Sequence, residues 1–152
     1  MVGEVEGRSK RLACGRALVG GGDVVGVVVK VEHPLSFLGE VDPLKGTLYD
    51  GRSIKNKVLV VKGVRGSTVG SYVIYALRYY NNAPLAIVVE GEADPIAVAG
   101  CVMAKLPLVD KTGPLGLRDG DEVLLRFTEG KGCILKVGGV DLKTSNRTAE
   151  GS

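Results

Sequence analysis

Two continuous apolar runs on either side of one amphipathic segment dominate the hydropathy pattern of this chain. The runs are Val58–Val61, within Lys57–Lys62, and Leu85–Val89, and neither alternates with polar residues. Such runs are typical of strands buried on both faces in a parallel sheet. Between them, five apolar residues form one stripe at helical spacing: Val69, Val73, Ala76, Leu77 and Tyr80. The pattern predicts a strand–helix–strand unit with a right-handed crossover.

The segments before and after this unit predict mostly strands. Valine-rich Val24–Val31 suits a pleated surface, and Leu12–Leu18 precedes it across a glycine-rich turn, which predicts an antiparallel hairpin. Towards the end, 122–127 and 132–137 flank a polar turn and predict a second hairpin. Val102–Val109 contains Pro107, which favours an edge segment.

Shorter features complete the expected fold. Asp94 before Pro95 predicts a short helix over Asp94–Ala99. His33–Gly46 has two prolines and no sustained period and predicts a loop, although it is apolar enough to cover a core or carry function. Thr47–Tyr49 predicts a short strand. Together these elements predict one β-rich α/β domain at 11–138, between a flexible N-terminus at 1–10 and a polar C-terminal tail at 139–152.

Composition narrows the functional class. The chain has 152 residues, no tryptophan, 5% aromatic residues and a net charge of +3, which argue against a nucleic-acid-binding surface. No apolar run reaches the ~20 residues needed to span a bilayer, and the polar N-terminus does not resemble a signal peptide. Cys14, Cys101 and Cys133 are odd in number and far apart, which predicts reduced, buried thiols in a cytoplasmic protein and no metal ligated by this chain.

The loop that leaves the first apolar run carries the candidate chemistry. It lies where ligands bind in such folds, and a helix beginning at Gly66-Ser67-Thr68 would present unpaired N–H groups to an anion. Arg65 could pair with a carboxylate or phosphate. On local sequence alone the favoured role of Ser67 is that of an N-cap, and the lysine of a Walker-type loop is absent. The single histidine, His33, is expected to be a loop or surface residue.

Several ordered motifs resemble one family. KGVRGSTVGS, from Lys62 to Ser71, resembles the signature of the aconitase-X small subunit, and PLSFLGEVDP, from Pro34 to Pro43, resembles its second motif. NNAPLAIVVEGEADPIAVAG, the LPLVD at Leu106–Asp110 and the turn at Gly120-Asp121 are also similar. The resemblance runs from about Leu12 to Val137, nearly the whole predicted domain.

This resemblance implies a fold and an activity. The fold would be a swivelling β/β/α three-layer domain like the mobile domain of aconitases. The activity would be that of a hydro-lyase subunit, active only with a large subunit that carries an iron–sulfur cluster. In archaea the family's stand-alone small subunits belong to an enzyme that converts (R)-5-phosphomevalonate to trans-anhydromevalonate 5-phosphate in a modified mevalonate pathway, and the resemblance implies that reaction. Partners would therefore be the large subunit and a small phosphorylated carboxylate, with no nucleic acid and no membrane.

The resemblance also implies roles for individual residues. Ser67 matches the family's proton acceptor. Arg65, Gly66 and Thr68 are expected to bind substrate beside it, and Ser36 and Asp42 are expected at the same mouth, where binding, orientation and loop capping all remain open. Three departures stand out: Leu38 replaces an aromatic residue, Glu40 replaces a glycine, and Val69 stands where aconitase proper has an arginine. The last departure implies that the substrate's second anionic group is held differently, by amides of the helix start or by the large subunit.

Two alternatives share these features. The chain could serve a dehydratase for another substrate, such as a hydroxyproline. It could also be a non-catalytic swivelling module that binds an anion or a partner protein, with Ser67 serving only as a helix cap.

Overall fold

The computed structural model describes residue 5, residues 7–65 and residues 69–138. Its helices are α2 (Phe37–Glu40), α3 (Gly70–Tyr79) and α4 (Pro95–Ala104). Its strands are β1 (Ser9–Val19), β2 (Val24–Leu35), β3 (Val41–Asp42), β4 (Thr47–Leu48), β5 (Val58–Val64), β6 (Ala86–Val89), β7 (Leu108–Asp110), β8 (Glu122–Thr128) and β9 (Lys131–Val137).

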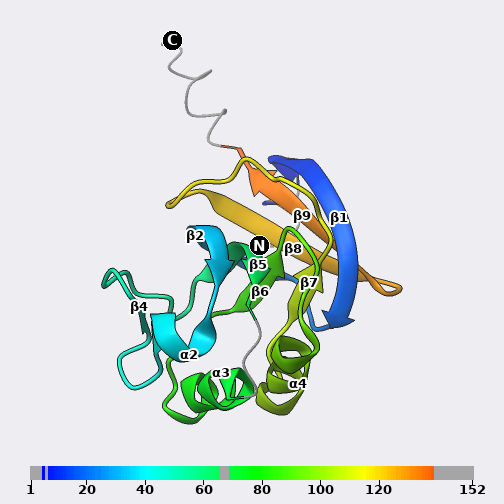
Figure 1. Ribbon diagram of the computed structural model, residues 1–152. Coiled ribbons are helices and arrows are strands. Elements are labelled where there is room, and N and C mark those ends of the chain that lie inside the picture. The colour runs from blue at the N-terminus through cyan, green and yellow to red at the C-terminus, as the bar shows by residue number, and fades with distance from the viewer. Residues whose placement is uncertain (1–4, 6, 66–68, 139–152) are drawn as a thin grey trace.

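Within the described residues, seven strands close into a barrel in the order β1-β7-β6-β5-β2-β8-β9, with β9 returning to β1 (Figure 1). The pairs β2–β5, β5–β6 and β6–β7 are parallel, and the remaining pairs are antiparallel. Strands β3 and β4 form a separate two-stranded ribbon. Helices α3 and α4 lie side by side against one end of the barrel (Figure 1). The predicted β-rich α/β domain is confirmed.

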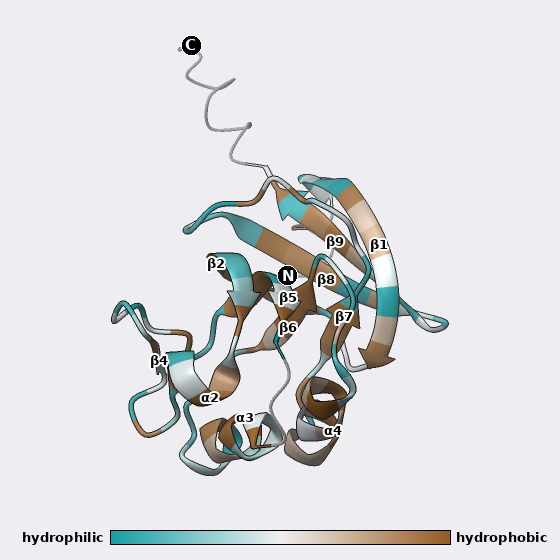
Figure 2. Ribbon diagram, in the orientation of Figure 1, coloured by the Kyte–Doolittle hydropathy of each residue, from teal (hydrophilic) through white to brown (hydrophobic). Residues whose placement is uncertain are grey.

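The continuous apolar runs serve two cores at once. Along β5, Val58 and Val60 face the barrel interior, whereas Leu59 and Val61 face the helices, and all four side chains are almost completely buried. Strand β6 alternates in the same way. Figure 2 shows hydrophobic colouring along these strands and over much of α4. Each fully buried side chain of this size contributes about 1.5–3 kcal/mol, so a double-faced strand is a strong local determinant of the fold.

The two main helices approach each other closely at a glycine. A Cβ atom on Gly100 of α4 would lie 3.0 Å from the Ser71 Cα atom and 3.1 Å from the Ile74 Cβ atom of α3. Helix α4 is capped by Asp94, whose Oδ1 accepts the N–H groups of Ile96 and Ala97. It continues five residues beyond the predicted end at Ala99 and stops where Lys105 adopts a left-handed conformation.

Several predicted elements are confirmed. Strand β5, helix α3 and strand β6 form the expected unit with a parallel strand pair, and β8 pairs with β9 as the closing hairpin. The short strand expected at Thr47–Tyr49 is β4. The predicted loop at His33–Gly46 is instead partly ordered, because β2 runs on to Leu35 and α2 and β3 follow. The predicted domain boundary at residue 11 falls inside β1, and the predicted tail lies outside the described residues.

Two pairing predictions are wrong. Strands β1 and β2 do not form a hairpin, because β1 pairs with β7 and β9 while β2 pairs with β5 and β8. The predicted edge segment at Val102–Val109 ends α4 and enters β7, which lies between β1 and β6. Pro107 is tolerated because it precedes the strand, where its carbonyl accepts the N–H of Ile87. Barrel closure depends on partners distant in sequence, which local patterns do not specify.

The prediction of three reduced, buried thiols is wrong for two of them. Cys14 and Cys133 are register partners on β1 and β9 and form a disulfide, with their Cα atoms 3.9 Å apart. Cys101, in α4, is a free buried thiol as predicted. Burial raises the pKa of Cys101 to about 12.

Candidate functional site

The predicted site lies where β2 and β5 end side by side. The Arg65 N–H donates to the Leu35 carbonyl at 2.9 Å, which continues the strand pairing one step beyond β5. Ser36 follows Leu35 directly and introduces α2. The chain then resumes at Val69, the N-cap residue of α3. Two of the residues predicted at the mouth, Arg65 and Ser36, are thus brought together by backbone pairing.

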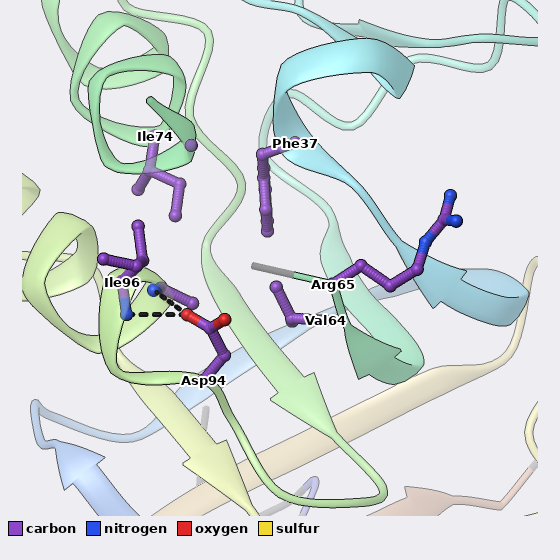
Figure 3. Close-up of a pocket in the computed structure, with 8 residues that line it drawn as sticks. Phe37, Val64, Arg65, Ile74, Asp94 and Ile96 are labelled. Carbon is purple, nitrogen blue, oxygen red and sulfur yellow. Dashed lines mark hydrogen bonds between the residues drawn. The ribbon is translucent and has the colours of Figure 1, made fainter. Parts of the chain in front are cut away.

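A small hollow opens between these strand ends and the starts of α3 and α4 (Figure 3). Its walls are mostly apolar: Phe37, Val64, Gly70, Ile74, Ile96 and Ala97. Asp94 is also at the edge, but its carboxylate is engaged in capping α4, with Oδ1 2.6 Å from the Ile96 nitrogen. The Arg65 side chain extends away from the apolar side chains, and its guanidinium is largely exposed (Figure 3). Arg65 therefore lines the hollow, but its guanidinium does not point into it.

Glu40 is the centre of a polar cluster beside Arg65. One carboxylate oxygen accepts the Ser36 N–H at 2.9 Å and lies 4.0 Å from the Arg65 Nη2 atom. The other oxygen lies 3.0 Å from His33 Nε2. The pKa of Glu40 is lowered, first by the Ser36 hydrogen bond and then by His33 and Arg65, while burial opposes the shift. Glu40 is thus an ionised group that orients the start of α2 and faces Arg65.

Asp42 occupies a different place from the one expected. Its Oδ1 accepts the N–H groups of Leu44 (3.0 Å) and Lys45 (3.3 Å), so it caps the turn between β3 and β4. The amide of Asn82, beyond the carboxyl end of α3, donates to two carbonyls of that same turn. The predicted mouth is at the amino end of the helix. The structure therefore shows Asp42 capping this turn, which is one of the three roles left open for it.

The predicted residues Gly66, Ser67 and Thr68 lie outside the described residues. Sequence reasoning missed Glu40 and assigned His33 to a loop or surface. A signal was present, because Ser36 and Glu40 stand four residues apart around a short helical turn, close to the spacing at which an acidic side chain returns to the N-cap backbone. In the sequence, Glu40 stands out only because it replaces a glycine of the family pattern.

The three cysteines of this chain do not gather at one place. Cys14 and Cys133 are bonded to each other at the barrel seam, which is the region where β1 pairs with β7 and β9. Cys101 is buried in α4. In the part of the chain that the structure describes, no three acidic, histidine or cysteine side chains gather as metal ligands. Among the same residues, no helix is both long enough and apolar enough to cross a membrane.

Comparisons with known proteins agree with these features. The aconitase X swivel domain profile matches residues 12–135. The phosphomevalonate dehydratase small subunit of Thermococcus kodakarensis is 44% identical over 130 residues, which cover 82% of this chain and 96% of that protein. The protein of the same name from Methanosarcina mazei is 43% identical over 122 residues, covering 74% and 84%.

Solved structures give the same answer. The crystal structure of Thermococcus kodakaraensis aconitase X in its holo form superposes with a TM-score of 0.72 at 42% identity, covering 83% of this chain and 96% of that one. The solution NMR structure of a UPF0107 protein gives a TM-score of 0.69 at 33% identity, covering 80% and 96%. The resemblance predicted from the sequence motifs is confirmed: this chain belongs to the aconitase X family, whose swivel domain it contains.

Proposed function

We propose that this chain is the small subunit of a hydro-lyase that dehydrates (R)-5-phosphomevalonate to trans-anhydromevalonate 5-phosphate together with a large subunit. Relatives that carry the name phosphomevalonate dehydratase small subunit come from several archaeal genera and align over most of their length. The name small subunit supports a heteromeric complex. The observation that carries the proposal is this match over most of both chains.

Within that enzyme we assign Ser67 as the proton acceptor. Dehydration requires a base for a proton alpha to a carboxylate. A serine is a weak base unless its alkoxide is stabilised, and an arginine two residues away can supply part of that stabilisation. Arg65 supports this assignment, because its backbone is fixed to Leu35 while its guanidinium stays largely exposed.

The Glu40 carboxylate is a neighbouring opposite charge for the Arg65 guanidinium. At 4.0 Å the contact orients the guanidinium without the short, bidentate geometry of a strong ion pair. An exposed contact of this kind is worth about 0–1 kcal/mol, which a substrate carboxylate could readily exceed. Arg65 is therefore suited to exchange Glu40 for the substrate, with Gly66 and Thr68 expected beside it.

The remaining chemistry is assigned to the large subunit. The disulfide and the buried Cys101 do not fit a cluster ligand set, so the family's iron–sulfur cluster is expected on the partner. This chain would supply the proton acceptor and part of the substrate contacts. We assign the departure of the hydroxide to the large subunit.

The test is product analysis from a reconstituted pair. A candidate large subunit is co-expressed with this chain under anaerobic conditions, and the complex is offered phosphomevalonate and, separately, a hydroxyproline. The proposal predicts trans-anhydromevalonate 5-phosphate from the first substrate, no turnover of the second, and no activity from either subunit alone. Turnover of the hydroxyproline only, or activity of the isolated large subunit, would contradict it.

A further inference from the structure

A second polar hollow lies next to His33. It is an open cleft of about 320 Å³, lined by Lys30, Glu32, His33, Tyr49, Arg52, Arg118 and Asp119. His33 borders it and also lies 3.0 Å from Glu40, so the cleft is continuous with the Glu40 cluster. The side chains come from β2, from the turn after β4 and from the segment before β8. Residues distant in sequence are thus assembled beside the candidate site.

Two of the three lysine and arginine side chains in this cleft are already neutralised. The Lys30 ammonium is buried and lies 3.4 Å from carboxylate oxygens of both Glu32 and Glu90. The Arg52 guanidinium donates to Asp50 at 2.9 Å and to Asp119 at 2.8 Å. The Lys30 ammonium and the Arg52 guanidinium, with their carboxylate partners, form the wall of the cleft. Both cations are already paired and are not available to bind an anionic ligand.

Arg118 is the exception. Its side chain is exposed and has no ion pair or hydrogen bond with any residue that the structure describes. Its backbone is nevertheless fixed, because the Arg118 N–H donates to the Asp121 carboxylate at 2.9 Å and the preceding Leu117 is buried. The guanidinium is therefore presented at the cleft from an anchored position. Tyr49, which packs beside His33 with ring centroids 5.5 Å apart, offers a hydroxyl on the same cleft.

We propose that Arg118 binds the phosphate group of the substrate in this cleft, with Tyr49 and His33 at its side. The proposal rests on the function proposed above and names the partner of the second anionic group. A guanidinium presents paired N–H donors that match phosphate oxygens bidentately. Val69 cannot fill the place that an arginine has in aconitase proper. Arg65 and Arg118 provide two separate cations for a substrate charged at both ends.

The test compares three variants in the reconstituted complex: Arg118→Gln, Arg118→Lys, and Arg11→Gln as a control at an exposed arginine of β1. For Arg118→Gln we expect the KM for phosphomevalonate to rise about tenfold or more, with kcat changed less than about threefold, because ground-state and transition-state binding are lost together. Arg118→Lys should recover part of the loss, since the charge remains but not the fork. Arg11→Gln should match the unmodified complex. An unchanged KM in Arg118→Gln, or a fall in kcat alone, overturns the proposal.

A binding experiment separates this proposal from the proposed function. If the unmodified complex does not dehydrate phosphomevalonate, the isotope-labelled full chain is titrated with inorganic phosphate, with chloride at matched ionic strength as the reference. Saturable amide shifts at Arg118 and Tyr49 that are retained in Arg11→Gln and lost in Arg118→Gln support a phosphate site independent of the reaction. No saturable shift, or shifts that persist in Arg118→Gln, overturns it.

Discussion

The barrel seam and the candidate mouth each centre on a carboxylate, but they hold it in opposite ways. At the seam, Asp110 is fully buried and accepts hydrogen bonds from Arg16 Nε (2.9 Å), Arg16 Nη2 (2.8 Å) and the Ala93 N–H (2.8 Å). At the mouth, Glu40 is partly exposed, and its nearest cationic arginine nitrogen, on Arg65, is 4.0 Å away. At the seam, the Asp110 carboxylate is fully hydrogen-bonded by protein groups. At the mouth, the Arg65 guanidinium is not held in a short ion pair and can bind a ligand.

The two regions also differ in sequence separation. Arg16 and Asp110 are 94 residues apart, and the disulfide at the same seam joins residues 119 apart. Glu40 contacts Ser36 and His33, four and seven residues away. Long-range contacts close the barrel and hold its strands, while local contacts shape the edge of a site. The comparison predicts large stability effects at the seam and effects on activity at the mouth.

The largest stability effect is expected from the disulfide. Removing it with the double variant Cys14→Ser, Cys133→Ser releases a loop of more than one hundred residues and should cost about 4–5 kcal/mol. Thermal unfolding should then begin well below that of the unmodified chain, and reductant should lower the unfolding temperature of the unmodified chain but not of the variant.

Thiol counting provides the control for this prediction. Without reductant, the denatured chain should expose one reactive thiol, that of Cys101. The native chain should expose almost none at pH 8, because burial raises the pKa of Cys101 to about 12 and the thiolate is the reactive form. Three reactive thiols in the denatured chain would contradict the disulfide.

A smaller loss is expected from Asp110→Asn. Breaking a buried ion pair costs about 3–5 kcal/mol, and the half-exposed Arg16 places this case near 3 kcal/mol. Burial alone would raise the pKa of Asp110, but the hydrogen bonds from Arg16 and Ala93 outweigh it and lower the pKa. The carboxylate therefore stabilises the fold above the unfolded pKa of about 3.9, and that contribution is lost as the pH falls through the folded pKa.

Urea unfolding at several pH values checks this sign. The stability difference between the unmodified chain and Asp110→Asn should be largest near pH 7 and should shrink below about pH 4. A difference that stays constant across this range would mean that Asp110 acts through packing alone.

Gly100→Ala is expected to cost up to about 1 kcal/mol net, because the contact of the added methyl group with the α3 backbone at Ser71 outweighs the ~1 kcal/mol that alanine gains over glycine inside a helix. The matched control is Gly20→Ala, where a Cβ atom meets nothing within 4 Å. Chemical denaturation of both variants gives the comparison, and equal stabilities would show that the helix contact is loose.

The smallest stability effect is expected at the mouth. Glu40→Gln keeps an oxygen for the Ser36 N–H and should change the free energy of unfolding by less than about 1 kcal/mol. Turnover by the reconstituted complex should nevertheless fall, by up to about tenfold, because Arg65 loses its charged neighbour. Glu122→Gln, at an exposed position of β8, is the control. A loss of stability without a loss of turnover would remove the distinction between seam and mouth.

The sequence predicts the elements of the fold whose signal is local, but not the contacts between residues that are far apart along the chain. The apolar runs of β5 and β6 and the helical stripe of α3 predicted the central unit correctly, because two-sided burial leaves a direct signature. The pairing of β1 with β7 and β9, and the disulfide, depend on barrel closure and had no local signal. The family motif predicted Asp42 at the mouth, whereas in the structure Asp42 caps a turn. Glu40 could have been found from its spacing to Ser36.

The central claim is that Ser67 accepts the proton. The direct test is the rate of product formation from phosphomevalonate by the reconstituted complex carrying Ser67→Ala, with Ser53→Ala as a control at an exposed serine. Complex assembly is verified for both by size-exclusion chromatography. The account predicts a fall of about 10²–10⁴-fold for Ser67→Ala, typical of a lost general base, and no change for Ser53→Ala. An assembled Ser67→Ala complex that retains full turnover would contradict the account.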